Sequence, residues 1–398
     1  MNRCLPTFFI RSRHTVTALH QAVLICGLTL GVLAPMAIAQ VTAPPKVPGG
    51  TTPVTSAPTT LPAPKPLKNE EKTSSSPTTA IIQSFVKDNV TRLTMEDADV
   101  ATVARGDLVT AAMSPNPSTP SSVIYLDTYI NALAREFSSA LAKNVSLRTK
   151  LNIAIVVAKV ADASKPILPA TALQNLIVQM MQDPNEGVSL WGMKGAAAIL
   201  TAPNQPAPNG VLLRLILPTI ESHKLSGAIT DEAYGALQDL NPQVIDILVK
   251  LYARRVGIYK TGAIPQDPAV EHHASAVLTV QASMWSKLTP ADRVKVMNLI
   301  ADLLSDSAKA MTGKVSVSDM EQLRTVISQT GAAVSVVADS LPDVSLHALA
   351  LSLSKIGSNN TPPVAVVQMV EPIVKAIRTD FPQNGAAAGN IVPNVAKP

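Results

Sequence analysis

The stretch TALQNLIVQMMQDPNEGVSLWGMKGAAAIL, residues 171–200, decides the fold of this chain. In its first half, apolar residues recur at the three- and four-residue intervals that place them on one buried face of a helix. Asp183 has a side chain suited to capping the next helix, and Pro184 suits a first helical turn, where a missing N–H costs little. The pattern predicts two helices folded back on each other, with Asp183 and Pro184 at the corner.

Small side chains mark the second of these helices. Val188, Gly192 and Ala196 lie on one helix face at intervals of four residues. Because small side chains let two helix axes approach closely, we expect Gly192 to lie against the preceding helix. On this interpretation Gly192→Leu costs about 1–3 kcal/mol by overfilling the contact, whereas Gly192→Ala is nearly neutral.

Helical periodicity continues on both sides of this stretch, and no segment shows the convincing alternation of apolar and polar residues that is typical of a strand. We therefore expect an all-α domain over residues 80–380, with a subdomain break at the proline-rich segment 201–210 and a flexible tail at 381–398. Ser121 or Ser122 is a candidate cap for the helix that follows a proline-rich turn, and Thr289 with Pro290 is expected to begin another.

Two short patterns recur at the expected helix starts. The phrase Val-Ser-Leu stands at residues 145–147, 188–190 and 344–346, and Asp or Asn followed by Pro and then Val stands at 183–188, 241–244 and 267–270. The first interval between the Val-Ser-Leu phrases is 43 residues, which lies within the ~40–47 residues of HEAT and armadillo repeats. The later intervals are irregular.

These patterns resemble the HEAT-repeat family, in which an Asp-Pro corner leads into a second helix that carries Val and small residues. The resemblance is strongest over residues 171–200 and extends loosely over 125–356. Ser189 stands where the family usually has Arg. The resemblance implies a helical-repeat solenoid that serves as a binding scaffold; an irregular multi-helix bundle is the alternative.

The N-terminal segment has the three parts of a secretory signal. Basic residues precede the apolar run at 22–39, which ends in Ala37-Ile38-Ala39 before Gln40. We expect cleavage between Ala39 and Gln40 and export to the periplasm or the extracellular space, with no stable membrane insertion afterwards. The alternative is an uncleaved N-terminal membrane anchor, because this run approaches the ~20 apolar residues that span a bilayer.

Removal of this signal would change the composition of the chain. Cys4 and Cys26 both precede Ala39, so the mature protein would contain neither a disulfide nor a thiolate metal site. Three of the 33 basic residues also precede Ala39, which leaves 30 basic against 28 acidic residues. That balance gives no strong basic field, so we expect no nucleic-acid partner.

Residues 40–79 are rich in proline and threonine. They hold nine prolines and no aromatic residue, so they cannot bury enough apolar surface to offset chain entropy. We expect a disordered linker that, in extended polyproline conformation, reaches on the order of 100 Å. It is either a spacer in the cell envelope or an inert tail.

Few residues have the spacing of a catalytic or metal site. Glu271, His272 and His273 follow Asp267, but adjacent helical residues point about 100° apart and the HExxH spacing is absent, so we expect a solvated polar helix start. The S-x-x-K matches at 84–87 and 352–355 lack the partner motifs of penicillin-binding enzymes.

Two further clusters are interpreted as structural. Arg254 and Arg255, with neighbouring tyrosines, are expected at a solvated helix end, where the helix dipole stabilises cations, rather than as a site for an anionic polymer. Trp191 and Trp285 are expected in the core. We therefore assign no catalytic, cofactor-binding or metal-binding residue.

Two functions remain open. The first is an exported, non-catalytic helical scaffold that binds a protein or polymer of the cell envelope. The second is an enzyme that acts on an envelope substrate through a dispersed site, for which Asp267, Glu271, His272 and the pair Arg254-Arg255 are the nearest candidates.

Overall fold

The computed structural model describes residues 65–74, 76–113, 119–203, 209–238, 242–279, 285, 288–338, 344–356 and 361–382, and over these residues the chain forms helices and no strand. The expected all-α class is therefore confirmed. The described elements are α2 (Asn69–Thr73), α3 (Thr79–Leu93), α4 (Ala98–Ala112), α5 (Pro120–Leu141), α6 (Leu147–Ser164), η1 (Thr171–Leu173), α7 (Gln174–Met181), α8 (Glu186–Leu200), α9 (Gly210–Ser222), α10 (Gly227–Ala236), α11 (Pro242–Lys260), η2 (Pro268–Val270), α12 (Glu271–Thr279), α14 (Pro290–Ala310), α15 (Val317–Ala338), α16 (Val344–Ser354) and α17 (Pro363–Asp380).

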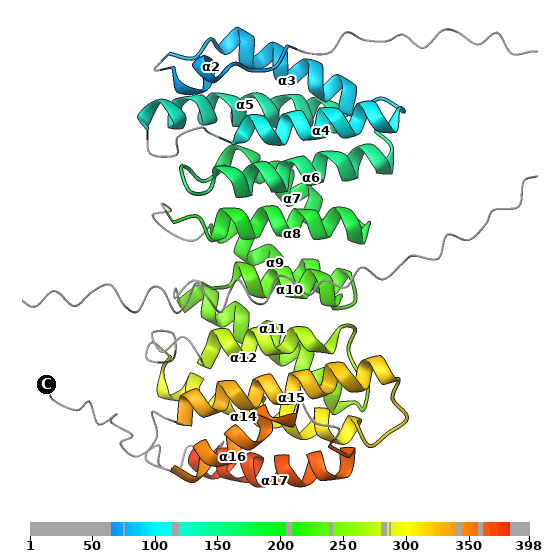
Figure 1. Ribbon diagram of the computed structural model, residues 1–398, viewed down its shortest axis with the longest axis vertical. Helices are drawn as coiled ribbons and strands as arrows, with labels where there is room; N and C mark the ends of the chain where they lie inside the picture. Colours follow the sequence, from blue (N-terminus) through cyan, green and yellow to red (C-terminus); the bar gives the residue numbers. More distant parts are fainter. Residues whose placement is uncertain are drawn as a thin grey trace, which may run out of the picture. The chain divides into compact units, whose positions relative to one another are not determined.

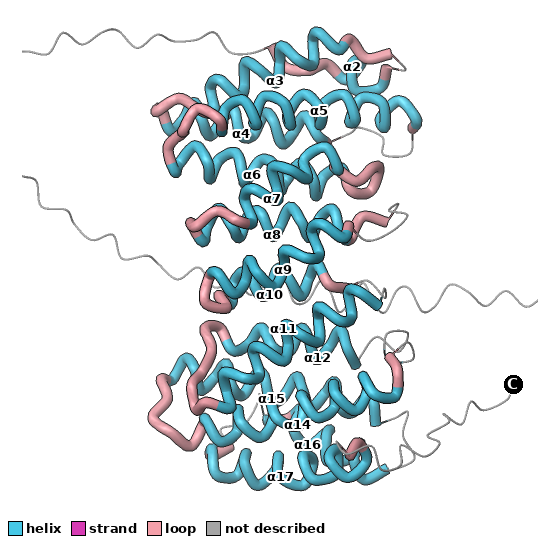
Figure 2. Tube along the Cα trace, turned by 180° about the vertical axis from the view of Figure 1, so that it is seen from behind, coloured by secondary structure: helices cyan, strands magenta, loops and turns pink. Residues whose placement is uncertain are grey.

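Most of these helices form two rows within one compact unit, Leu61–Pro398. Helices α3, α5, α7, α9, α11, α14 and α17 follow one another in the first row, and α4, α6, α8, α10, α12, α15 and α16 follow one another in the second (Figure 1). The view from behind shows the same succession (Figure 2). Each helix packs mainly on its neighbours in the stack, an arrangement compatible with a helical solenoid.

The hairpin of residues 171–200 has the expected two helices and a different cap. Asn185, not Asp183, caps α8 by accepting a hydrogen bond from the Val188 N–H at 3.2 Å. Asp183 instead accepts a hydrogen bond from the Asn185 N–H at 2.9 Å. It also forms an ion pair with Lys150 at 3.2 Å. The corner needs both side chains, because two residues separate Asp183 from the first helical residue, Glu186.

Gly192 lies against α7, as expected, and the contact is closer than the sequence indicates. A Cβ atom added to Gly192 would lie 2.6 Å from the Met181 amide nitrogen and 2.9 Å from the Met180 carbonyl carbon. Backbone atoms cannot move aside as a flexible side chain can, so even alanine does not fit without displacing α7. The expectation that Gly192→Ala is neutral is contradicted by this geometry.

Other expected helix starts can be compared directly. Thr289 caps α14 by accepting the Asp292 N–H, and Pro290 occupies the first position, as expected. The helix after the proline-rich turn begins earlier than expected, because Pro120 already lies in α5 and Ser122 is buried within it. Thr119 holds the cap position there.

The outer boundaries of the helical domain also differ from expectation. Helix α2 lies inside the stretch 40–79 that we expected to be linker, and it is held in place because Lys72 donates a hydrogen bond to the Thr110 carbonyl. Phe381, the first residue of the expected tail, is buried against Trp285. Residues 1–64, 204–208 and 383–398, with the signal, most of the linker, the centre of the expected subdomain break and most of the tail, lie outside the described residues.

Within the described part of the chain, no helix combines the length and the apolar composition needed to cross a bilayer.

Candidate functional site

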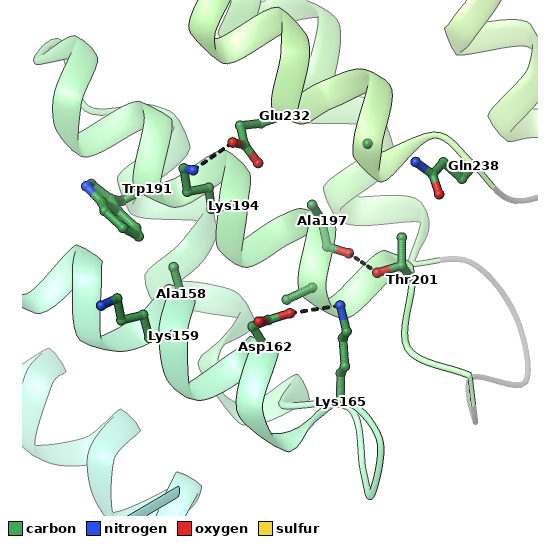
Figure 3. A pocket seen from close by; sticks show the side chains of 12 residues that line it. Ala158, Lys159, Asp162, Lys165, Trp191, Lys194, Ala197, Thr201, Glu232 and Gln238 are labelled. Atoms are coloured by element: carbon green, nitrogen blue, oxygen red, sulfur yellow. Dashed lines mark hydrogen bonds and ion pairs between the residues drawn. The ribbon is translucent and has the colours of Figure 1, made fainter. Parts of the chain in front are cut away.

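A groove crosses the second row of helices where α6, α8 and α10 lie side by side (Figure 3). Its volume is about 570 Å³, a size typical of ligand-binding sites. Small residues from the three helices form part of its lining and leave the space open: Ala158, Ala197, Ala198 and Gly235. Helices α6 and α8 are in van der Waals contact here, because a Cβ on Gly195 of α8 would lie 3.7 Å from the Ala158 Cα of α6.

Trp191 supplies the aromatic surface of this groove. Its side chain is half-buried, and the Lys194 ammonium lies 5.3 Å from the centre of its ring. Lys194 also pairs with Glu232 of α10 at 2.7 Å. A cation over an indole face is stabilised by the ring quadrupole, so Trp191 and Glu232 together fix the position of the Lys194 charge.

Two more lysines line the groove along α6. Lys165, the C-cap residue of α6, pairs at 2.8 Å with Asp162 in the last turn of that helix (Figure 3). Lys159 is exposed, and its side chain has no ion-pair or hydrogen-bonding partner among the residues that the structure describes. The groove therefore carries three cations and two carboxylates, with one cation unpaired.

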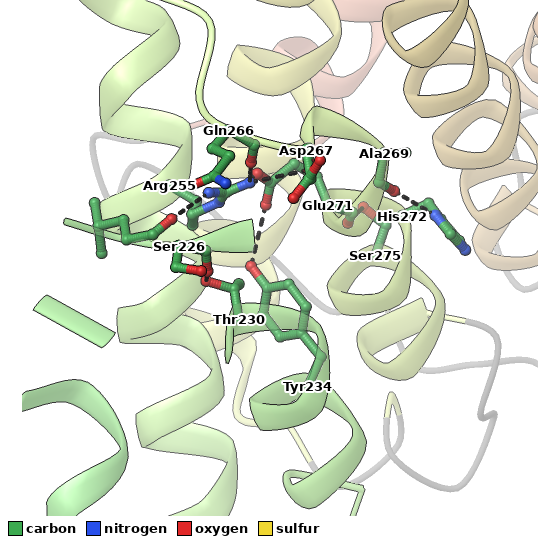
Figure 4. Close-up of polar contacts among 11 residues, drawn as sticks. Ser226, Thr230, Tyr234, Arg255, Gln266, Asp267, Ala269, Glu271, His272 and Ser275 are labelled. Carbon is green, nitrogen blue, oxygen red and sulfur yellow. Dashed lines mark hydrogen bonds and ion pairs between the residues drawn. The ribbon is translucent and has the colours of Figure 1, made fainter. Parts of the chain in front are cut away.

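The residues that the sequence analysis considered for catalysis lie elsewhere, in a buried polar cluster (Figure 4). Arg255 of α11 and Glu271 of α12 form an ion pair at 2.6 Å, and both side chains are fully buried. Tyr234 of α10 donates a hydrogen bond to the second Glu271 oxygen at 3.1 Å. The cluster thus joins three consecutive helices of the stack.

Arg255 also stabilises two segments of non-helical backbone, at residue 225 and at residues 266–267. Its guanidinium donates to the carbonyls of Leu225 at 2.7 Å, Gln266 at 2.9 Å and Asp267 at 3.3 Å. Leu225 and Asp267 have φ values of 59° and 47°, in the left-handed region that non-glycine residues rarely adopt. Hydrogen bonds from a buried charge offset the strain of these two conformations.

The electrostatics of the cluster follow from its burial. Desolvation raises the pKa of Glu271 above its ordinary value, against the opposing effect of Arg255. Burial raises the pKa of the Tyr234 hydroxyl, and the neighbouring Glu271 carboxylate raises it further. Because these groups bind one another and are closed to solvent, the cluster is suited to holding helices together rather than to contacting a substrate.

Several expectations for this region are therefore corrected. Glu271 does begin α12, as expected, but it is buried rather than solvated, and Arg255 is buried within α11 rather than at a solvated helix end. Arg254 is exposed, as expected, and pairs with Glu221. Asp267 contributes its carbonyl to the Arg255 cluster. These positions could not be found from local spacing, because they depend on how three helices meet.

The rings of His272 and His273 lie edge to face with their centroids 4.1 Å apart, and they have different polar partners. The His272 ring contacts the Ala269 carbonyl, and burial lowers its pKa, whereas His273 faces Asp231 at 3.2 Å. The described residues contain no group of three or more His, Cys, Asp or Glu side chains that could hold a metal ion.

The remaining sequence candidates are also placed. Ser84 and Ser352, the serines of the two S-x-x-K matches, bond to Asp88 and to the Leu349 carbonyl, within their own helices. Trp285 is buried, as expected, whereas the expected burial of Trp191 is only partial. Ala39 and Gln40, the expected cleavage site, lie outside the described residues.

Comparison with known proteins identifies no family. No protein-family model matches the chain, and no curated protein matches it. Among solved structures, the crystal structure of an engineered protein is similar over 73% of this chain and 97% of that chain, at 15% sequence identity and a TM-score of 0.27. At that score the similarity carries no argument about fold or function.

Proposed function

We propose that this protein is an exported, non-catalytic scaffold that binds a protein of the cell envelope through the groove between α6, α8 and α10. The observation that carries the proposal is the groove itself, which combines an accessible indole on α8 with an unpaired cation on the neighbouring helix α6. Accessible tryptophan side chains are enriched at protein-binding surfaces and contribute strongly to affinity there.

The HEAT-like architecture is part of this proposal. Support comes from the two rows of helices and from the close contact of Gly192 with α7. A stack in which each helix pair contacts its neighbours offers side chains from successive pairs to one partner. The groove draws on three such helices.

Export is proposed from the N-terminal sequence alone. Signal peptidase requires small residues such as Ala37 and Ala39, so the mature protein is expected to begin at Gln40. N-terminal sequencing or the intact mass of protein recovered from the cell envelope tests this. A mature form that retains Cys26 would instead support a membrane anchor.

Site-specific photo-crosslinking tests the binding function. A photoreactive amino acid at Gln238, an exposed residue of the groove, is expected to give one discrete adduct in intact cells, identified by mass spectrometry. The same amino acid at Asn131, exposed on α5 of the first row, serves as the control. Equal labelling from both positions, or none from Gln238, would contradict binding through the groove.

The enzyme alternative is less well supported, because Arg255 and Glu271 are buried and bonded to each other. Turnover of an envelope polymer by the purified protein, abolished in a folded Glu271→Gln variant, would favour it over the scaffold.

A further inference from the structure

The groove contains three lysines and two carboxylates, and two of the lysines are paired with the carboxylates. Lys165 and Lys194 are paired with Asp162 and Glu232, which leaves Lys159 as the cation available to a ligand. Lys159 of α6 and Trp191 of α8, the aromatic side chain of the lining, both face this groove. An incoming carboxylate would therefore find a cation close to an apolar surface.

The carboxylates of the groove restrict what this ligand is. Asp162 is 66% exposed and Glu232 is 28% exposed, so both act on anything that enters. Because each is paired with a lysine, a uniformly anionic chain such as an acidic glycan meets one unpaired cation among the five charged positions and is still repelled by the exposed carboxylate oxygens. A peptide avoids this penalty, because its backbone N–H groups donate to carboxylates while one acidic side chain meets Lys159.

The dimensions of the groove fit an extended segment. Neighbouring helices lie about 8–10 Å apart, so the three helices span roughly 20 Å from the first axis to the last. An extended chain covers about 3.3 Å per residue, which gives on the order of six residues across the groove.

We infer that the groove binds an extended peptide segment of a partner protein, in which an acidic residue pairs with Lys159 and a neighbouring apolar residue packs on Trp191. This inference rests on the proposed binding function and adds the chemistry of the partner.

A displayed library of random seven-residue peptides, selected on the full chain, tests the inference. Selected peptides are expected to be enriched in Asp or Glu next to an apolar residue, and the enrichment is expected to disappear when the selection is repeated on Lys159→Glu or Trp191→Ala. Lys87→Glu is the matched control, because Lys87 is also an exposed helical lysine but lies on α3. Selected sequences without an acidic preference would overturn the inference.

Affinity measurements with the most enriched peptide, labelled with fluorescein, make the test quantitative. Lys159→Glu is expected to raise Kd about tenfold or more, whereas Lys87→Glu leaves Kd unchanged and both variants keep the parent melting temperature. Replacing the acidic residue of the peptide by its amide should raise Kd for the parent protein and have little effect in the Lys159→Glu variant. Effects that simply add would overturn the pairing.

A hyaluronate hexasaccharide tests the alternative ligand class, an acidic polysaccharide. Tighter binding of this acidic glycan than of the selected peptide, lost in Lys159→Glu, would overturn the peptide assignment in favour of a polysaccharide. Loss of crosslinking at Gln238 would contradict the groove as a binding site altogether, whereas crosslinking without an acidic peptide preference contradicts only the partner chemistry.

Discussion

Arg255 and Glu271 show how a single pair of residues fixes a junction between helices. A charge inside a protein is costly unless it is paired and hydrogen-bonded, and here the two charges satisfy each other and three backbone carbonyls. Removing one partner leaves the other charge buried and unpaired.

We therefore expect Arg255→Met to lower the free energy of unfolding by about 3–5 kcal/mol. Arg254→Met, at the adjacent exposed ion pair, is the control and should cost about 0–1 kcal/mol. Denaturant titrations measure both. In a double-mutant cycle, Arg255→Met with Glu271→Leu is expected to cost less than the sum of the single changes; strictly additive losses would show that the pair does not act as a unit.

Gly192 makes a second residue-scale prediction. Its added Cβ would meet backbone atoms of α7, so we expect Gly192→Ala to lower the free energy of unfolding by about 1–3 kcal/mol, despite the better helix propensity of alanine. Gly106→Ala is the control, because a Cβ there meets no atom within 4 Å in the middle of α4, and it should stabilise by about 0.5–1 kcal/mol. Thermal melts compare the two, and stabilisation by both changes would contradict the close helix contact.

At the scale of single elements, short-range chemistry sets most helix starts. Asn185 caps α8, Thr289 caps α14, and each bonds to an amide three residues later. Helix α2 is different, because a five-residue helix is not stable alone and depends on packing against α5. Leu67 packs on the core beside it, and Glu71 accepts the Thr78 N–H.

Truncation tests this dependence. We expect deletion of residues 1–64 to leave the melting temperature of the helical part unchanged, whereas deletion of residues 1–78 lowers the free energy of unfolding by about 1–2 kcal/mol, since it also exposes apolar surface under Leu67. Calorimetry of the two truncated proteins makes the comparison. Equal melting temperatures would show that α2 contributes nothing to stability.

At the scale of the whole molecule, the two tryptophans report on different parts of the stack. Trp191 lies in α8, before the Arg255 cluster, and Trp285 packs on Phe381 after it. In a stack stabilised by contacts between neighbours, cooperativity depends on the weakest junction. Arg255 bonds to backbone on both sides of its own helix, at Leu225 and at Asp267, so it couples the two parts.

Single-tryptophan proteins measure this coupling. With only Trp191 or only Trp285 retained, the parent chain is expected to give coincident unfolding transitions in denaturant, followed by fluorescence. Adding Arg255→Met should separate the two unfolding midpoints, because the two parts of the stack are then no longer coupled and each unfolds at its own denaturant concentration. Midpoints that shift together would show that the cluster contributes to stability without coupling.

The amino-acid sequence by itself determined the helical class, the hairpin of residues 171–200, the Thr289 cap and the close packing at Gly192. These features depend on residues within about one or two turns of each other, so apolar spacing and capping chemistry encode them directly. The cap of α8 shows the limit of this reasoning, since Asp183 and Asn185 both suit the role and the length of the corner selects Asn185.

Only the tertiary structure decided which polar residues are buried and where the groove lies. Periodicity gives the apolar face of a helix, but not the neighbour that covers it or the charge that a distant loop brings to it. Arg255 is adjacent to exposed Arg254 in the chain, yet it is buried because carbonyls from residues 225 and 266 converge on it. The groove likewise exists because α6, α8 and α10 stack with small residues between them, which leaves Trp191 accessible beside an unpaired lysine.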